Sequence, residues 1–146
     1  MAAVAAAADP ACFADQIAAG LTPHQVKKLY FTALPKRFFA ALADSLSAAG
    51  IDVNKLAGPR VGDLREWGYP DELVTTAIDV SRTLEQKRQS FLCHRTQLDP
   101  EGPFAMALKL GGETWRGPMS TEYFQRVLPP VVPGEPQETD LFAGLE

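Results

Sequence analysis

The sequence predicts an α/β fold in which a sheet of few strands is covered by helices. Three segments rich in β-branched and aromatic residues, 26–33, 74–80 and 121–128, are typical of strands. The segment 35–50 instead repeats its apolar residues at helical spacing. A chain of 146 residues with 46% hydrophobic residues has the size and the apolar content of one domain with its own core.

The strand 26–33 is expected to be largely buried, and the helix 35–50 is expected to cover the sheet. Pro35 suits the first turn of this helix and Gly50 suits its end. Its apolar face consists of Phe38, Phe39, Leu42, Leu46 and Ala49. Shorter helices are expected at 2–8, 10–20 and 104–110.

The remaining connections are expected to be irregular. Residues 51–66 lack a clear period and contain Gly58 and Pro59, so they are predicted to be a link. Trp67 and Tyr69 flank a turn and are interpreted as packing lids more readily than as pocket walls. Trp115 follows two glycines and is expected in a loop.

The segment from Arg82 to Asp99 contains no Gly or Pro and is predicted to be one helix, with Ser81 as its N-cap. Three apolar residues recur seven apart and should form its buried seam: Leu84, Phe91 and Leu98.

Lys87 and His94 are also seven apart in this segment, with Gln97 alongside. On one interpretation Lys87 is a solvated rim charge and His94 is paired inside the structure, so that His94→Ala mainly lowers stability. On the other, Lys87, His94 and Gln97 face a polar cleft at the end of strand 74–80. The spacing does not decide between a structural and a cleft-facing role.

The C-terminal region is predicted to divide from the body near residue 130. Residues 131–138 are rich in Pro, Gly and Glu and are expected to be an extended, largely unpacked linker within a tail that spans 131–146. The apolar residues that follow are interpreted as a hook able to dock on the body or on another subunit: Leu141, Phe142 and Leu145.

Composition argues against several classes of partner. The net charge of −4, without a basic stripe, disfavours nucleic acid, and no apolar run approaches the ~18 residues of a membrane span. The alanine-rich start lacks the basic residues of a secretory signal, so a cytoplasmic location is expected. Cys12 and Cys93 are predicted to be free thiols, because they lie far apart in the sequence and form no CxxC motif. A zinc site built from them with His24 and His94 is disfavoured, because none of the four are paired at metal-ligand spacing.

Several blocks of the chain resemble, in order, the C-terminal part of the LmbE-like deacetylases, relatives of N-acetylglucosaminylphosphatidylinositol de-N-acetylase that include mycothiol-pathway enzymes. The blocks are WGYPDE at 67–72, VTTAIDV at 74–80, Lys87, CHRTQLDP at 93–100, STEYF at 120–124 and DLFAG at 140–144. The resemblance implies a Rossmann-like α/β/α hydrolase. In that family, two His and one Asp hold a zinc ion that activates water against an N-acetyl amide.

The motifs that carry this chemistry in the family, His-Pro-Asp-Asp-Glu and a second of the His-Pro-Asp-His type, do not occur in the sequence. The chain has only two histidines, His24 and His94, and neither precedes Pro-Asp. Residues 1–130 are therefore expected to be a partial deacetylase domain from the C-terminal part of such an enzyme, inactive alone, with no catalytic residue and no metal ligand assigned.

The resemblance implies zinc and a sugar-conjugate substrate only for the full-length enzyme. The expected partners are the missing N-terminal half or a second copy of the chain. The alternative is a non-catalytic interaction module derived from the same family, which binds a partner through an open sheet edge.

Overall fold

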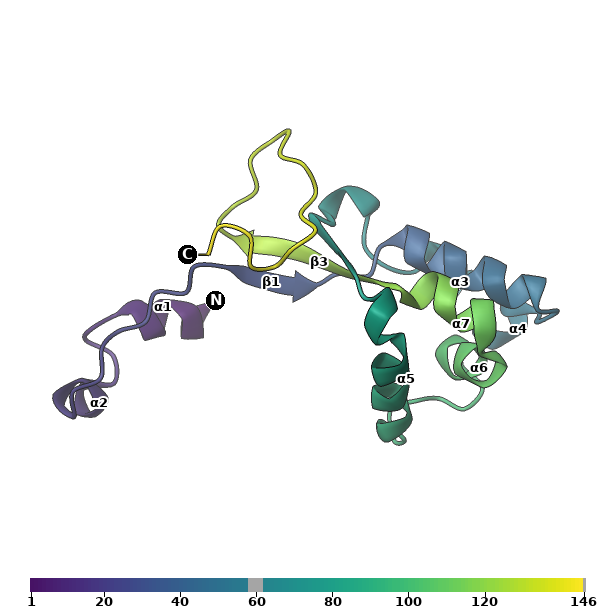
Figure 1. Cartoon of the computed structure of the whole chain (residues 1–146), viewed down its shortest axis with the longest axis horizontal. Coiled ribbons are helices and arrows are strands. Elements are labelled where there is room, and N and C mark those ends of the chain that lie inside the picture. The colour runs from purple at the N-terminus through teal and green to yellow at the C-terminus, as the bar shows by residue number, and fades with distance from the viewer. Residues whose placement is uncertain (58–61, 146) are drawn as a thin grey trace.

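The computed structural model describes residues 1–57 and 62–145 and divides into an N-terminal arm, a small sheet and a helical end (Figure 1). The helices are α1 (Ala2–Ala8), α2 (Ala14–Ala18), α3 (Lys36–Ala48), α4 (Val53–Ala57), α5 (Leu84–Cys93), α6 (Pro103–Leu110) and α7 (Gly112–Met119). Three short 3-10 helices are η1 (Leu64–Glu66), η2 (Asp71–Leu73) and η3 (Ser81–Thr83). The strands are β1 (Leu29–Thr32), β2 (Thr76–Asp79) and β3 (Thr121–Leu128).

The sheet has the order β1-β3-β2, and both pairs are antiparallel. Thr32 of β1 and Thr76 of β2 both lie opposite Phe124 of the central strand. The mixture of helices and a few-stranded sheet confirms the α/β class. The Rossmann-like arrangement stays a prediction, because that fold is built on a mostly parallel sheet.

β1 is an edge strand, so the prediction of a largely buried strand at 26–33 was wrong. Only Leu29–Thr32 form the strand, and the Phe31 side chain is 48% exposed. β3 shields β1 on one side only, so apolar residues in this segment do not imply burial.

The main core lies among the helices rather than between a helix layer and the sheet. α3 packs most extensively against α7, η1 and α6. The most deeply buried core side chains come from these elements: Leu42, Ala43, Leu46, Leu64, Ala107 and Met119. The expectation that α3 covers the sheet is therefore corrected, and Ala49 is exposed while Ala43 takes the buried position.

Tyr123 connects the sheet to this core. Its ring lies 6.4 Å from the Phe38 ring in an edge-to-face arrangement, and the Arg37 guanidinium lies 5.1 Å from its centroid. Aromatic pairs of this kind add to the burial energy. β3 is thus fastened at its first half to the helical end.

Two parts of the helical end were not predicted. Residues 51–66 contain α4 and η1, which bury Val53 and Leu64, although Gly58 and Pro59 of the expected link lie outside the described residues. Trp115, expected in a loop, lies in α7 and is only 5% exposed. Burial of this large side chain against Phe91, with ring centroids 5.4 Å apart, outweighs the weak helix propensity around it.

α5 is shorter than the helix predicted for 82–99. Ser81 is not a side-chain N-cap: its own N–H donates to the Asp79 carboxylate at 2.8 Å. The helix ends at Cys93, so Leu98 lies beyond it. The predicted seam is nevertheless kept, because Leu84 is buried in the core and both Phe91 and Leu98 pack against it.

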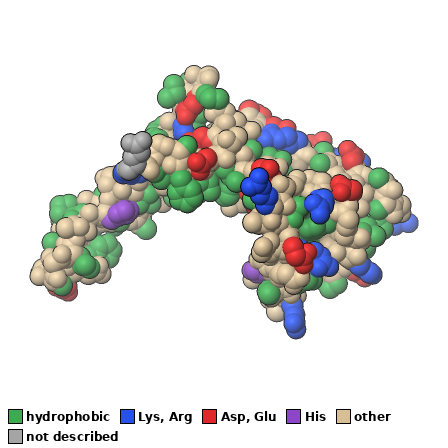
Figure 2. Space-filling model, in the orientation of Figure 1, with side chains coloured by type: hydrophobic (Ala, Val, Ile, Leu, Met, Phe, Trp, Pro, Cys, Tyr) green, Lys and Arg blue, Asp and Glu red, His purple; other side chains and the backbone are tan. Residues whose placement is uncertain are grey.

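The N-terminal arm projects from the sheet and leaves apolar side chains uncovered (Figures 1 and 2). Phe13 is 59% and Leu21 is 60% exposed. The chain exposes 9656 Å² in total, whereas a compact monomer of this mass exposes about 7300 Å². None of the described helices has the length and apolar character to cross a bilayer.

Candidate functional site

Lys87 lies on the sheet side of α5 and is already paired. Its ammonium group contacts the Glu122 carboxylate at 2.8 Å and donates to the backbone carbonyl of Met119 at 2.8 Å. The side chain is 15% exposed, so it is not a solvated rim charge. It ties α5 to the start of β3.

His94 follows the last residue of α5 and is exposed, which corrects the interpretation that it is paired inside the structure. Its Nδ1 lies 2.8 Å from the Ser90 carbonyl oxygen of the same helix. This contact holds the ring against the end of the helix. The Nε2 atom has no protein partner among the described residues.

His94 and Gln97 line a cavity of about 310 Å³ at the end of α5. Its other walls are largely apolar and come from Ser90, Phe91, Leu98 and Phe104. Lys87 does not line it, and it lies where α5 meets α6 rather than at the end of β2. The structure therefore brings two of the three predicted residues together, in a place different from the one the sequence suggested.

A second cavity of about 280 Å³ adjoins the first and shares Gln97, Leu98 and Phe104 with it. Trp67 and Asp99 contribute to its walls. We call the two cavities together the α5–α6 groove. Trp67 thus lines a pocket while also packing against the core, whereas Tyr69 is 50% exposed and does not contribute.

Phe104 was not singled out from the sequence as a groove residue, although it is central to it. Its ring stacks on Phe91, with centroids 6.1 Å apart and an angle of 25°. The sequence signal for Phe104 was its position immediately after Pro103, which places it in the first turn of α6. That its ring forms a wall of the groove is shown only by the packing of α6 beside α5.

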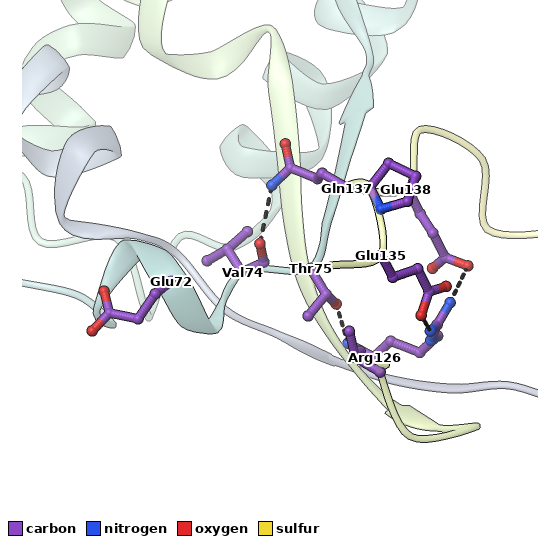
Figure 3. Close-up of a pocket in the computed structure, with 9 residues that line it drawn as sticks. Glu72, Val74, Thr75, Arg126, Glu135, Gln137 and Glu138 are labelled. Carbon is purple, nitrogen blue, oxygen red and sulfur yellow. Dashed lines mark hydrogen bonds and ion pairs between the residues drawn. The ribbon is translucent and has the colours of Figure 1, made fainter. Parts of the chain in front are cut away.

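A cluster centred on Arg126 was missed entirely (Figure 3). The Arg126 guanidinium donates to Glu135 at 2.6 Å and to Glu138 at 2.7 Å, and its Nε–H donates to the Pro129 carbonyl at 3.1 Å. Arg126 is only 8% exposed. Hydrogen bonds with Glu135 raise its pKa further above an already high value, so the charge is permanent.

Glu138 is the most heavily bonded carboxylate in this cluster. Beyond Arg126, its three further donors are Lys28 at 2.9 Å, Tyr30 at 2.8 Å and Thr76 at 3.1 Å. Burial by itself would raise the pKa of Glu138, but hydrogen bonds from Lys28, Tyr30 and Arg126 prevail and lower it to about 2. The carboxylate is therefore ionised at neutral pH.

The backbone of Glu138 also extends the sheet. Its N–H donates to Thr75 and its carbonyl accepts from Ala77, both at 2.9 Å, which covers the outer edge of β2. Residues 131–137 are exposed, but the expectation that the segment is largely unpacked is corrected at Glu135 and Glu138, which fasten it to the sheet through Arg126. We call this fastening of residues 135–138 by Arg126, Lys28 and Tyr30 the tail clasp. The polar groups of the tail clasp hydrogen-bond to one another, so the clasp serves a structural role.

The described residues do not fit the zinc ion that the family resemblance implies. No group of three or more His, Cys, Asp or Glu side chains among them is placed to hold a metal. Cys12 donates to Asp9 at 3.6 Å, and burial together with the Asp9 charge raises the pKa of the thiol, which disfavours the thiolate that zinc binds. No step of the chemistry is therefore assigned through a metal on this chain.

Comparison with known proteins gives one consistent result. The chain is 36% identical over 123 residues, 83% of its length, to a 1D-myo-inositol 2-acetamido-2-deoxy-alpha-D-glucopyranoside deacetylase of Acidothermus cellulolyticus. It is 34% identical over 146 residues, 99% of its length, to the deacetylase of the same name from Geodermatophilus obscurus. A relative from Catenulispora acidiphila is 36% identical over 141 residues.

The chain spans less than half the length of these curated relatives, with 40%, 47% and 41% of each covered. No family model matches it. No solved structure is similar enough to match either.

Proposed function

Because this chain belongs to the family of the 1D-myo-inositol 2-acetamido-2-deoxy-alpha-D-glucopyranoside deacetylases, we propose that it is the C-terminal portion of a hydrolase that removes acetate from an N-acetylated amino-sugar conjugate. The observation that supports this most is the extent of the similarity, which covers 99% of the chain in one relative. Similarity of this length supports a framework shared with these deacetylases.

Within such an enzyme this portion supplies the framework and part of the surface around the substrate. The family resemblance assigns the zinc-held water to motifs absent from this sequence, and the described residues provide no replacement for them. We therefore infer that the full enzyme is zinc-dependent and that the isolated chain binds no stoichiometric zinc. We also infer that it releases no acetate.

The isolated chain tests the second half of this proposal. Purified 146-residue protein is incubated with zinc, desalted and analysed for metal, and acetate release from 1D-myo-inositol 2-acetamido-2-deoxy-α-D-glucopyranoside is measured. We expect no tightly held zinc and no turnover above the buffer control. One zinc per chain together with steady acetate release would show that the reaction centre lies within this chain.

A chimera tests the first half. The matching segment of the Geodermatophilus obscurus enzyme is replaced by this chain, and acetate release is compared with that of the unaltered enzyme. We expect measurable deacetylation, because the chain would restore the framework that its counterpart supplies. A folded, monodisperse chimera without activity would contradict the proposal.

A second candidate is a non-catalytic interaction module descended from the same family. The observation that favours it is the excess of exposed surface, 9656 Å² against about 7300 Å² for a compact monomer. Such a module predicts an inactive chimera and a stable complex of the isolated chain with another protein. The activity of the chimera therefore separates the two candidates.

A further inference from the structure

We propose that the α5–α6 groove binds a neutral, hydroxyl-rich six-membered ring, either a pyranose or a cyclitol. This inference rests on the proposed function, since it assigns a binding place to one ring of the substrate class named for the relatives. It concerns a surface of the chain itself and requires no metal.

The floor of the groove suits the apolar face of such a ring. Phe91 and Phe104 stack at 6.1 Å and present aromatic surface beside Leu98. The axial C–H groups of a pyranose or cyclitol form an apolar face that packs against aromatic carbon, while its hydroxyls point outward to the rim. The two adjoining cavities of about 310 and 280 Å³ give room for one ring with its substituent.

The rim supplies polar groups that are free to bind hydroxyls. His94 keeps its ring oriented through Nδ1 and leaves Nε2 without a protein partner among the described residues. The side-chain amide of Gln97 likewise makes no hydrogen bond within the part of the chain that the structure describes, and it offers both donor and acceptor. Asp99, in the adjoining cavity, adds a carboxylate whose Oδ1 already accepts from the Glu101 N–H at 3.1 Å and whose second oxygen can accept from a ligand hydroxyl.

The charge of the groove restricts the ligand further. No Lys or Arg is among the described residues that line either cavity. A phosphorylated or carboxylated ring would therefore find no counter-charge among these described residues and would meet the Asp99 carboxylate instead. The chemistry selects an uncharged ring over an anionic one.

In the test, the full chain is titrated with each ligand. Binding is monitored by NMR signals of the backbone and side-chain amides. The ligands are methyl 2-acetamido-2-deoxy-α-D-glucopyranoside, myo-inositol and, as the anionic arm, glucose 6-phosphate. We expect saturable shifts at Gln97 and at the Trp67 indole with one or both neutral rings and none with the phosphate. The first two ligands distinguish the amino sugar from the cyclitol.

Variants locate the binding place. Gln97→Ala and His94→Ala should each weaken binding roughly fivefold, the effect of losing one hydrogen bond, with unchanged circular dichroism. Gln89→Ala is the matched control: it removes an exposed amide from α5, one that is bonded to Glu85 at 2.7 Å and does not line the groove. Equal effects at Gln89 and Gln97 would overturn the proposal.

Two further results would also overturn it. Shifts confined to residues outside the groove would place the ligand elsewhere. Concentration-dependent broadening of the groove signals without ligand would show that a second copy of the chain occupies it.

Failure here is distinguishable from failure of the proposed function. An active chimera whose KM for the relatives' substrate is unchanged by Gln97→Ala would contradict the groove assignment alone. An inactive chimera together with ring binding lost in Gln97→Ala would contradict the proposed function and leave the groove standing.

Discussion

The helical core and the tail clasp both join distant segments, but they are held by opposite kinds of interaction. The core joins α3, α6 and α7 through apolar side chains such as Leu42 and Met119, which are 0% and 1% exposed. The clasp joins segments up to 110 residues apart through the charges of Arg126, Lys28 and Glu138. The helical core excludes water. In the tail clasp, protein donors replace the hydrogen bonds that water would make to the carboxylates.

The difference teaches what each region contributes. Burial of apolar surface supplies free energy with little directionality, so the core holds the helices together. A buried ion pair adds little net stability because desolvation offsets the attraction, yet breaking one partner is costly. The clasp therefore acts mainly by specifying where the tail lies, along the outer edge of β2.

The largest effect is expected from the core. Leu42→Ala removes a fully buried side chain and should lower the free energy of unfolding by about 4 kcal/mol. Urea denaturation followed by circular dichroism measures this change, which should not depend on salt. Leu42→Met is the control, with an expected loss below about 1.5 kcal/mol. A loss for Leu42→Ala no larger than this control would show that the helical end is not a close-packed core.

Arg126→Met should come next, at about 3 kcal/mol, because it leaves the Glu135 and Glu138 carboxylates beside the sheet without their main partner. Limited proteolysis should then cut within residues 131–138, which the wild-type clasp protects. The double change of Arg126→Met with Glu138→Leu should recover part of the lost stability. A double variant as unstable as the sum of the two single variants would mean that the two side chains do not act as a pair.

The pH dependence should be strongest at the clasp, where the pKa of Glu138 is lowered the most. The pKa of Glu138 is lowered from 4.5 to about 2, so its stabilising effect is complete above pH 4.5 and is lost as the pH falls towards 2. Glu138→Gln should be less stable than the wild type by about 2 kcal/mol at pH 7, and the difference should vanish near pH 2. Leu42→Ala should show a constant difference over this range. A Glu138→Gln difference that persists at pH 2 would contradict the role of the carboxylate charge.

The smallest effect on stability is expected at His94. The side chain is exposed, and its one hydrogen bond among the described residues is to Ser90 in the last turns of α5, so His94→Ala should change the free energy of unfolding by less than about 0.5 kcal/mol. This replaces the expectation that the change acts mainly through stability. Thermal unfolding measures it, and a large loss would indicate that His94 belongs to the core.

The sequence predicted the elements whose residues interact locally. β3 has the predicted bounds of Thr121–Leu128, and α3 lies within the predicted 35–50. α7 was missed because Gly112 and Pro118 have low helix propensity, and the burial of Trp115 overrides them. Of the residues that line the α5–α6 groove, His94 and Gln97 were identified from the sequence, but Phe104 was not.

The tail clasp shows why the rest was out of reach. Glu135 and Glu138 lie in a segment rich in Pro and Gly, a composition typical of linkers. Their partners are 9 to 110 residues away. In the sequence, a glutamate that will pair with a distant arginine looks the same as one that makes no ion pair.

Periodicity and residue type by themselves determined the α/β class, the three strands, the long amphipathic helix and, through the order of its sequence blocks, the family. Only the tertiary structure decided that the helices pack on one another, that Lys87 and His94 separate, and that the tail returns to the sheet. The physical reason is that backbone preference depends on near neighbours. Burial and charge pairing depend on which distant segments meet.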